Sequence, residues 1–360
     1  MDAAITIEVL HGAHGDAIWI ECAREGRPWR MVVDGGPPEA AGALAARVDA
    51  MPPGDRALDV VVVSHIDSDH IGGILPLLER DDLDIGDVWF NALPQLPEAD
   101  ERPTRSVAEG EDLVGLLSGV TRGRPLPWNR VAGGGAIATP ADRTFCEYQL
   151  TDGPQITLLS PTPKRLLALR RIWDDALTRL HRGESEEIEP PAPPEPLSDL
   201  VALAASKTTN DTSVPNGSSI AFLLEHRGAS CLLGADAFPT VLGGALWALV
   251  NARSIDRVAV DAVKLPHHGS QKNVGAKLLT LLSTTHFLIS TNGDRFGHPD
   301  DVSLARAVTA NSSRPTLWFN YPPTAKTRRW AEPDLNARYG FTTNFAESAE
   351  GTRLELPERP

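Results

Sequence analysis

One short segment of the chain holds four potential metal ligands within six positions: His65, Asp67, Asp69 and His70. Imidazole and carboxylate side chains are the usual protein ligands of Zn²⁺, and Mn²⁺ is favoured as oxygen atoms replace nitrogen atoms. The alternative is a polar turn between a strand and a helix, with Asp69 capping the helix, but capping needs only one such residue. The other three residues would then be unexplained, so the spacing favours a metal site.

The flanking pattern predicts that these four residues follow a buried strand. Residues 58–64 form an apolar, largely β-branched run of the kind found in strands that are buried on both faces, and residues 71–80 have the apolar spacing of a helix. Open α/β sheets usually place their chemistry at such strand ends. We therefore expect the four side chains on a loop between a central strand and a helix.

The rest of the sequence predicts further strands and helices, and polar residues follow several of these strands. Strands are expected at 5–10, 17–22, 29–33, 220–224, 230–233, 258–265, 286–291 and 316–320, the last closing the fold. Helices are expected at 40–49, 107–117, 164–182, 274–282 and 301–309. The polar residues that follow these strands are Asp34, Asp236, His267, His268 and His298.

Composition limits the class of protein. The chain has 360 residues, 41% of them hydrophobic, which is enough to bury a full core. Its 48 acidic and 34 basic residues give a formal net charge of −14, which counts against tight, non-specific binding of nucleic acid. Three widely spaced cysteines fit a reducing compartment, so we expect a cytoplasmic location. Neither a signal-peptide pattern nor a run of about 18 apolar residues occurs, so no membrane association is expected.

Seven short motifs occur in order between about residues 5 and 325. They are Gly15-Asp16-Ala17, Val33-Asp34-Gly35-Gly36, the His65 to His70 cluster, Asn216-Gly217-Ser218-Ser219, Gly234-Ala235-Asp236, Lys264-Leu265-Pro266-His267-His268-Gly269-Ser270 and Gly297-His298-Pro299. This ordered set resembles the metallo-β-lactamase superfamily and is similar in particular to the C-terminal domain of ComEC-type competence proteins.

The resemblance implies a fold and a place for the site. The expected fold is α/β, an αββα sandwich of two mixed β-sheets flanked by helices, formed as one domain over residues 1–360. Surface insertions are expected at about 91–150 and 161–215, and the second contains a Pro-rich loop at 188–197 whose composition cannot bury much apolar surface. The metal site would lie at one edge between the two sheets.

The resemblance also implies a set of metal ligands. His65 and Asp67 would hold one ion, Asp69 and His70 a second, and Asp236 would bridge them. One histidine of the pair 267–268 would complete the second site; His268 is favoured as the ligand, and His267 as a group that contacts the substrate or supports a ligand. Asp34 would orient a ligating imidazole, since such imidazoles normally need an outer acceptor, and the alternative is a simple turn residue.

The chain departs from the commoner lactamase pattern at two positions. Asp67 occupies a position where histidine is usual, and the histidine expected before Ser219 is missing, so only Asn216 or Ser218 could substitute for it. Oxygen then replaces nitrogen at the first metal, which shifts the preference from Zn²⁺ toward Mn²⁺ and weakens occupancy. We expect a divalent cofactor, one or two ions of Zn²⁺ or Mn²⁺.

These residues predict a hydrolase that uses metal-activated water. A divalent ion, or a pair roughly 3.5–4 Å apart, lowers the pKa of bound water toward ~7. The expected catalytic residues are Asp69, which would orient this nucleophile, His267, and His298, which would contact a phosphate oxygen or protonate the leaving group unless it is only a loop residue before a proline. No Gly-Xaa-Ser-Xaa-Gly elbow and no cysteine in a Cys-His setting supports covalent catalysis.

The sequence is compatible with more than one class of substrate. The resemblance implies phosphodiester hydrolysis, of nucleic acid or of a smaller anionic substrate, while hydrolysis of small esters, lactones or thioesters is the alternative within the same chemistry. Basic candidates for an anion are Lys264, Lys272, Lys277, Arg295 and the run 326–330, in which Trp330 could stack on a base; otherwise they are ordinary solvated surface.

A different class of function is a regulatory or partner-binding protein. Its insertions within residues 91–215 would bind a protein partner, and its metal site would be structural or vestigial. Retention of the whole cluster with Asp236 and both His267 and His268 argues for activity instead, because a purely structural site needs no open position for water.

Overall fold

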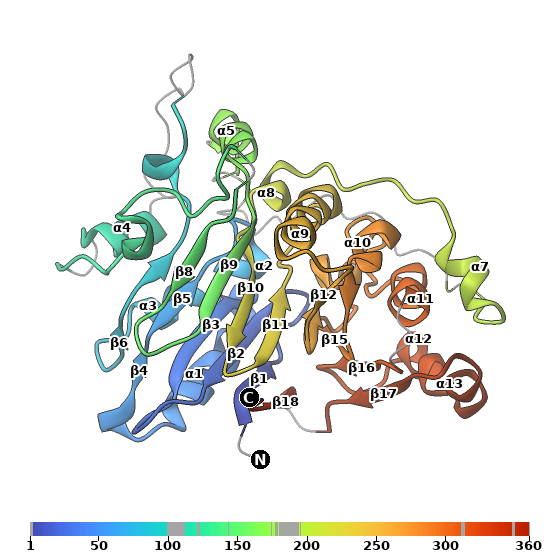
Figure 1. Ribbon diagram of the computed structural model, residues 1–360. Helices are drawn as coiled ribbons and strands as arrows, with labels where there is room; N and C mark the ends of the chain where they lie inside the picture. The colour runs from blue at the N-terminus through green and yellow to red at the C-terminus, as the bar shows by residue number, and fades with distance from the viewer. Residues whose placement is uncertain are drawn as a thin grey trace.

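Two large β-sheets pack face to face and carry helices on their outer faces (Figure 1). The computed structural model describes residues 3–98, 112–120, 123–142, 144–173, 175–176, 179, 194, 196–310, 314–347 and 350–359. This layering confirms the expected α/β sandwich of mixed sheets between helices. No helix in these ranges is both long enough and apolar enough to cross a bilayer.

The first sheet has six strands in the order β18-β1-β2-β3-β5-β7. Its strands are β1 Ala3–Val9, β2 Ala17–Cys22, β3 Trp29–Gly35, β5 Val60–Val62, β7 Val88–Trp89 and β18 Thr352–Pro357. β1, β2 and β3 form antiparallel hairpins, whereas β3, β5 and β7 run parallel. Because β3 and β5 are parallel neighbours, the residues that follow them meet at one edge of the sheet.

The second sheet has eight strands in the order β17-β16-β15-β13-β11-β10-β9-β8. Its strands are β8 Glu147–Gln149, β9 Gln155–Ser160, β10 Ala221–His226, β11 Ala229–Leu233, β13 Ala262–Lys264, β15 His286–Ile289, β16 Thr316–Phe319 and β17 Thr342–Phe345. β11, β13, β15, β16 and β17 run parallel to one another, whereas β10 is antiparallel to both β11 and β9. Two small parallel pairs complete the strands: β4 Ala57–Leu58 with β6 Asp84–Ile85, and β12 Val258–Ala259 with β14 Leu282–Ser283.

Helices cover the outer faces of both sheets. The helices are α1 Ala41–Asp49, α2 Ser68–Ile71, α3 Ile74–Leu78, α4 Asp112–Ser118, α5 Pro163–Arg171, α7 Leu200–Ala204, α8 Val214–Gly217, α9 Pro239–Arg253, α10 Ala276–Thr280, α11 Asp301–Ala310, α12 Ala325–Arg328 and α13 Pro333–Tyr339. Apolar residues of α1, α3, α4 and α5 pack in one core cluster with the six-stranded sheet. Those of α7, α9, α10 and α11 pack in another with the eight-stranded sheet.

The alternation of side chains along β3 and β5 explains why both faces of this sheet are apolar. Val32 and Val61 are paired across the two strands and join the core under α1 and α3. Val33 and Val62, one position later, join the core between the two sheets. Each fully buried valine contributes about 1.5–3 kcal/mol. The valine run therefore fixes the strand that delivers the metal-ligand cluster.

Several expected elements differ from the structure. The run 258–265 forms two strands, β12 and β13, and the helical pattern at 71–80 is divided, with α2 ending before Gly72 and α3 starting after Gly73. The expectation that 316–320 closes the fold is wrong, because β17 and β18 follow it and β18 pairs with β1. This pairing brings the two ends of the chain together (Figure 1).

The proposed insertions are described only in part. Residues 99–111, seven of the ten residues of the Pro-rich loop 188–197 and parts of the helices expected at 107–117 and 164–182 lie outside the described residues. Leu113, Leu116 and Leu117 of α4 are buried in the core with α1 and α3. The bounds of the insertions and the single-domain assignment stay predictions.

Candidate metal centre

Side chains from four strand ends and one hairpin loop meet at one edge between the sheets. Asp34 lies at the end of β3, His65 follows β5, Asp236 follows β11 and His268 follows β13. The structure brings them into groups of three whose ligand atoms all lie within 4.8 Å of one another: His65, His70 and Asp236; Asp69, His70 and His268; Asp16, Asp236 and His268; Asp16, Asp34 and His70. Every member of these groups is buried.

Asp34 and Ser64 fix the orientation of two imidazoles. Asp34 accepts hydrogen bonds through Oδ1 from the Ser64 backbone N–H (2.7 Å) and through Oδ2 from the Ser64 hydroxyl (2.6 Å). Oδ2 also accepts from Nδ1 of His70 at 2.8 Å. Since the single proton of the Ser64 hydroxyl is directed to Asp34, its oxygen accepts from Nδ1 of His65, 3.0 Å away. Both imidazoles therefore carry their hydrogen on Nδ1 and keep a lone pair on Nε2.

His268 has the same tautomer for a different reason. Its Nδ1 lies 2.9 Å from the backbone oxygen of Ser290 and 3.1 Å from Oδ1 of Asp16, and both atoms are acceptors. The hydrogen therefore lies on Nδ1, and Nε2 presents its lone pair to the cluster. Both His267 and His268 have left-handed backbone conformations, with φ of 47° and 54°, in the turn Pro266–Gly269. Such conformations cost on the order of 1–3 kcal/mol each in non-glycine residues and concentrate at functional sites.

The Nε2 atoms of His65, His70 and His268 have no hydrogen-bond partner among the described residues, and neither has Oδ1 of Asp236. Nε2 of His70 lies 3.3 Å from Oδ2 of Asp236, and Nε2 of His268 lies 3.7 Å from Oδ2 of both Asp236 and Asp69. Buried lone pairs that face carboxylate oxygens repel one another unless a cation lies between them. The donor set of imidazole nitrogens and carboxylate oxygens fits Zn²⁺ or Mn²⁺.

The electrostatics of the cluster attract positive charge. Burial alone would lower the pKa of His268, but the carboxylates of Asp236 and Asp16 outweigh it and raise the pKa to about 9. The pKa of His70 is raised well above 6.5 against burial in the same way, mainly by Asp236 and Asp34. Burial would raise the pKa of Asp236, yet the surrounding imidazoles hold it well below its usual value. Protons and a metal ion therefore compete for this cluster.

Asp16 and Lys264 form a support that sequence reasoning missed. Oδ2 of Asp16 pairs with Nζ of Lys264, while its Oδ1 faces His268, and all three side chains are buried. Lys264 was expected as a surface cation, and this is wrong, because β13 places it inside the fold with no exposed surface. Asp16 was visible in the Gly15-Asp16-Ala17 motif but received no role. Gly15, the residue before Asp16, allows the chain to pass close to the backbone of Asp69, because a Cβ at position 15 would lie 1.8 Å from the backbone oxygen of Asp69.

Asp67 precedes α2 as its N-cap residue, and Asp69 lies in the first turn of this helix. Oδ2 of Asp67 lies 3.5 Å from Nε2 of His65. The capping interpretation of Asp69 is wrong, because Asp69 is inside α2 and the N-cap residue is Asp67, whose side chain makes no capping hydrogen bond. Both carboxylates are therefore left to face the imidazoles.

His267 lies beside the cluster and joins a second hydrogen-bond chain. Its Nδ1 donates to Oδ1 of Asn273 at 3.0 Å, and its Nε2 lies 3.6 Å from Oδ2 of Asp236. Asn273 in turn donates to Oδ2 of Asp211 at 2.9 Å, which also accepts from Nδ2 of Asn216 at 2.9 Å. His267 belongs to none of the three-ligand groups found among the described residues. Asn216 is thus placed at the far end of this chain rather than against an imidazole.

Two other expected site residues have distinct surroundings. The Ser218 hydroxyl donates to the backbone oxygen of Pro215 at 2.6 Å, so this hydrogen bond is made within the turn at the end of α8. The His298 ring lies 5.3 Å from the His267 ring, centre to centre, and its Nδ1 is 3.6 Å from Oδ2 of Asp300. Burial lowers the pKa of His298, so its imidazole is mostly neutral near pH 7.

The basic run 326–330 does not offer an aromatic for base stacking. Trp330 has no exposed surface, and its indole N–H donates to Oδ1 of Asp301 at 2.9 Å. Arg329 pairs with Oδ2 of the same carboxylate at 2.8 Å. The expectation of a stacking platform at Trp330 is therefore wrong, because this side chain belongs to the core under α12 and α13.

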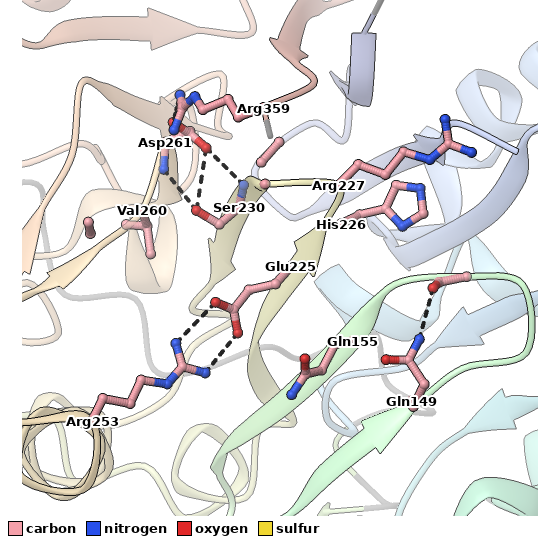
Figure 2. A pocket seen from close by; sticks show the side chains of 14 residues that line it. Gln149, Gln155, Glu225, His226, Arg227, Ser230, Arg253, Val260, Asp261 and Arg359 are labelled. Carbon is pink, nitrogen blue, oxygen red and sulfur yellow. Dashed lines mark hydrogen bonds and ion pairs between the residues drawn. The ribbon is translucent and has the colours of Figure 1, made fainter.

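A cavity of about 600 Å³ lies at the other end of the eight-stranded sheet, around the β10–β11 hairpin (Figure 2). Its wall includes the first residues of β11, whereas Asp236 follows the last residue of that strand. Arg253 forms a bidentate ion pair with Glu225 at 2.9 and 3.0 Å, and Arg359 pairs with Asp261. These cations are already paired, and the cavity is separate from the metal-ligand cluster.

Comparison with known proteins supports the fold. Residues 30–145 match the family model described as the Metallo-beta-lactamase superfamily. The matched stretch contains Asp34 and the His65 to His70 cluster but ends before Asp236 and His268. No curated protein sequence matches the chain.

Three solved structures are similar to this chain over most of its length. Zn²⁺-bound PqqB from Methylobacterium extorquens is 13% identical with a TM-score of 0.42, and the match covers 98% of this chain and 100% of that one. Unliganded yeast PDE1 is 12% identical with a TM-score of 0.40, covering 98% and 100%. The short form of human tRNase Z is 11% identical with a TM-score of 0.36, covering 81% and 96%. Likenesses this distant carry no argument about activity.

Proposed function

We propose that this chain, whose fold is that of the metallo-β-lactamase superfamily, is a metal-dependent hydrolase that acts on phosphodiesters. One observation carries the proposal: three buried imidazoles each donate through Nδ1 and present an unpartnered Nε2 to the carboxylates of Asp69 and Asp236. Such a set of facing lone pairs would be stabilised by a divalent cation between them. The similarity to ComEC-type C-terminal domains is part of this proposal.

In this proposal each residue of the cluster has a stated task. His65 and Asp67 would hold one ion, and Asp69, His70 and His268 would hold a second. Asp236, whose Oδ2 lies 3.3 Å from Nε2 of His70, would contribute its carboxylate to both. When bound, Zn²⁺ or Mn²⁺ supplies Lewis acidity, which lowers the pKa of a coordinated water and polarises the attacked group. Asp34 and Asp16 hold the imidazoles of His70 and His268 in the tautomer that leaves Nε2 free.

Asp69 would position the nucleophile, and His267 and His298 would position the substrate. Asp69 lies in α2 with Oδ2 3.7 Å from Nε2 of His268, where it would accept a hydrogen bond from the attacking water. His267 places Nε2 3.6 Å from Oδ2 of Asp236, and the His298 ring lies 5.3 Å from the His267 ring. Because burial keeps His298 neutral, hydrogen-bond donation to a phosphate oxygen fits it better than full proton transfer.

A phosphodiester is favoured over a neutral ester because the divalent cations that the cluster would hold attract a negatively charged group. Metal pairs clamp both the attacking and leaving oxygens of a phosphoryl group in an in-line displacement. The acidic chain, with a net charge of −14, favours a small phosphodiester over a long polyanion.

The test is hydrolysis by metal-loaded protein. Protein loaded with Mn²⁺ or Zn²⁺ should hydrolyse bis-p-nitrophenyl phosphate, and His70→Ala or Asp236→Asn should abolish turnover with little loss of fold. Asp334→Asn, an exposed carboxylate of α13, is the matched control and should retain activity. Equal background rates for the wild type and both site variants on phosphodiester, lactone and thioester substrates would show that the chain is not this hydrolase.

A further inference from the structure

A second cavity, of about 350 Å³, lies next to the metal-ligand cluster. The proposed hydrolysis uses one of its lining residues, His298, but assigns no ligand to the cavity itself. The loop 291–299 after β15 and the segment 319–327 from the end of β16 into α12 form most of its wall. β15 and β16 are parallel neighbours, and β15 also pairs with β13, which leads to His268. The cavity therefore opens at the same edge of the sheet as the cluster.

His298 connects the cavity to the cluster. It lines the cavity on one side, and on the other its ring lies 5.3 Å from the His267 ring. His267 in turn places Nε2 3.6 Å from Oδ2 of Asp236. A phosphate held between the cluster and His298 would thus direct one of its substituents into the cavity.

The wall of the cavity is held in place from the β1–β2 loop. The backbone N–H of Ala13 donates to the Tyr321 hydroxyl at 2.8 Å, and the backbone oxygen of Ala13 accepts from Asn292 N–H at 2.8 Å. The Tyr321 ring also stacks on His11 at a centre distance of 4.1 Å and an angle of 13°. The same loop continues to Asp16, which supports His268, so the cavity and the cluster share one rigid frame.

Lys326 gives this cavity its chemical preference. It is the only lysine or arginine among the described residues that line the cavity. Its Nζ donates to the backbone oxygen of Gly297 at 2.6 Å and lies 3.9 Å from Oδ1 of Asp300, and its side chain is 21% exposed. An ammonium group has three hydrogens, so one bond to Gly297 and a distant carboxylate leave it able to bind an anion.

The remaining lining sets the size and polarity of the occupant. Phe319 and Tyr321 supply aromatic surface, Thr324 and Asn292 supply polar groups, and the carboxylate of Asp294 accepts a hydrogen bond from Nδ2 of Asn292 at 2.9 Å. About 350 Å³ is at the small end of the roughly 300–1,000 Å³ that ligand pockets span. This space suits one nucleoside-sized group, whereas a strand of nucleic acid would need a continuous groove.

We propose that this cavity binds the part of the substrate beyond the scissile phosphodiester, a nucleoside-sized group that carries a second phosphate, and that Lys326 recognises this phosphate. The inference rests on the proposed phosphodiesterase function and narrows its substrate class to small phosphodiesters with an additional terminal phosphate.

The test compares two dinucleotides that differ only in the terminal group. Metal-loaded protein is assayed with a linear diadenylate that carries a 5′-phosphate, with the same dinucleotide lacking it, and with bis-p-nitrophenyl phosphate. The wild type should prefer the phosphorylated dinucleotide in kcat/KM by about 10-fold, which corresponds to about 1.4 kcal/mol. Lys326→Met should remove this preference through KM, change the kinetics of the other two substrates far less, and be rescued in part by Lys326→Arg.

The controls separate this inference from the proposed function. Arg338→Met, an exposed cation of α13, should keep the wild-type preference. Calorimetry of both dinucleotides with the metal-loaded protein adds a readout that needs no turnover. Hydrolysis without any dependence on Lys326 overturns the cavity assignment and leaves the hydrolase standing. Binding that depends on Lys326 without hydrolysis of any substrate overturns the hydrolase and leaves the cavity site standing.

Discussion

Replacing Lys264 by methionine tests the buried support of the metal centre. Lys264 and Asp16 are both buried and form an ion pair, and Asp16 also contacts Nδ1 of His268 at 3.1 Å. Removing one partner of a buried pair leaves an uncompensated charge and costs about 3–5 kcal/mol. Folded proteins are stable by only about 5–15 kcal/mol, so Lys264→Met should remove a large share of the total. Methionine keeps much of the lysine stem volume, so lost packing contributes little to this figure.

The assay is urea unfolding followed by tryptophan fluorescence in the presence of a chelator. The midpoint should fall while the dependence on urea stays unchanged, which identifies a loss of stability rather than a change in the unfolded state. Lys277→Met on the surface of α10 is the matched control and should stay within about 0.5 kcal/mol of the wild type. The double variant Asp16→Asn with Lys264→Met should be more stable than Lys264→Met alone, because an amide at position 16 needs no cation.

Two results would refute this reasoning. One is a Lys264→Met protein that unfolds within about 0.5 kcal/mol of the wild type, as a surface substitution does. The other is a double variant no more stable than the single variant. Either would mean that Asp16 does not depend on Lys264 for its charge.

Three further predictions concern the local packing, the acid stability and the metal. Gly15→Ala should destabilise by about 1–3 kcal/mol in urea, because the new Cβ would meet the Asp69 backbone oxygen, whereas Gly42→Ala in α1 meets nothing within 4 Å and should be neutral or stabilising. Burial would raise the pKa of Asp59, but its bonds to Arg27 and the Arg30 backbone lower it below 3.8, so its contribution is present above about pH 4 and is lost as pH falls through the lowered value. The acid loss of unfolding free energy should therefore be shallower for Asp59→Asn, and equal slopes would contradict the prediction. Mn²⁺ or Zn²⁺ at 100 times its dissociation constant should stabilise the wild type by about 2.7 kcal/mol, seen as a rise in melting temperature that Asp236→Asn loses and Asp334→Asn keeps.

The sequence was sufficient to predict the layered fold and most of its strands because the apolar patterns are local. The valine run of β5 and the alternation in β1 and β2 are readable within six residues. Helix α9, Pro239–Arg253, was not expected, since Gly243 and Gly244 lower helix propensity in its middle, although Leu242, Leu246 and Leu249 bury one face. β18 was missed because its partner β1 is more than 340 positions away along the chain.

The residues of the candidate site could likewise be predicted where their signal is local, and not where it depends on residues far apart in the sequence. The His65 to His70 cluster is a local signal, and the structure brings His65, Asp69 and His70 together with Asp236 and His268. The pairing of Asp16 with Lys264 spans 248 positions, so no local pattern reveals it. One signal could have corrected the view of Lys264: it follows the apolar residues Ala262 and Val263 of β13 and precedes Leu265, which is a place where a lysine needs a buried partner.

The central claim is that the buried imidazoles and carboxylates hold a divalent cation. Crystals grown with Mn²⁺ and measured at the manganese absorption edge test it most directly, because anomalous scattering locates the ion without reference to activity. We predict one or two strong peaks between Nε2 of His70, Nε2 of His268 and the carboxylate of Asp236. A well-folded protein whose manganese peaks all lie elsewhere, or with no peak at saturating Mn²⁺, would contradict the claim.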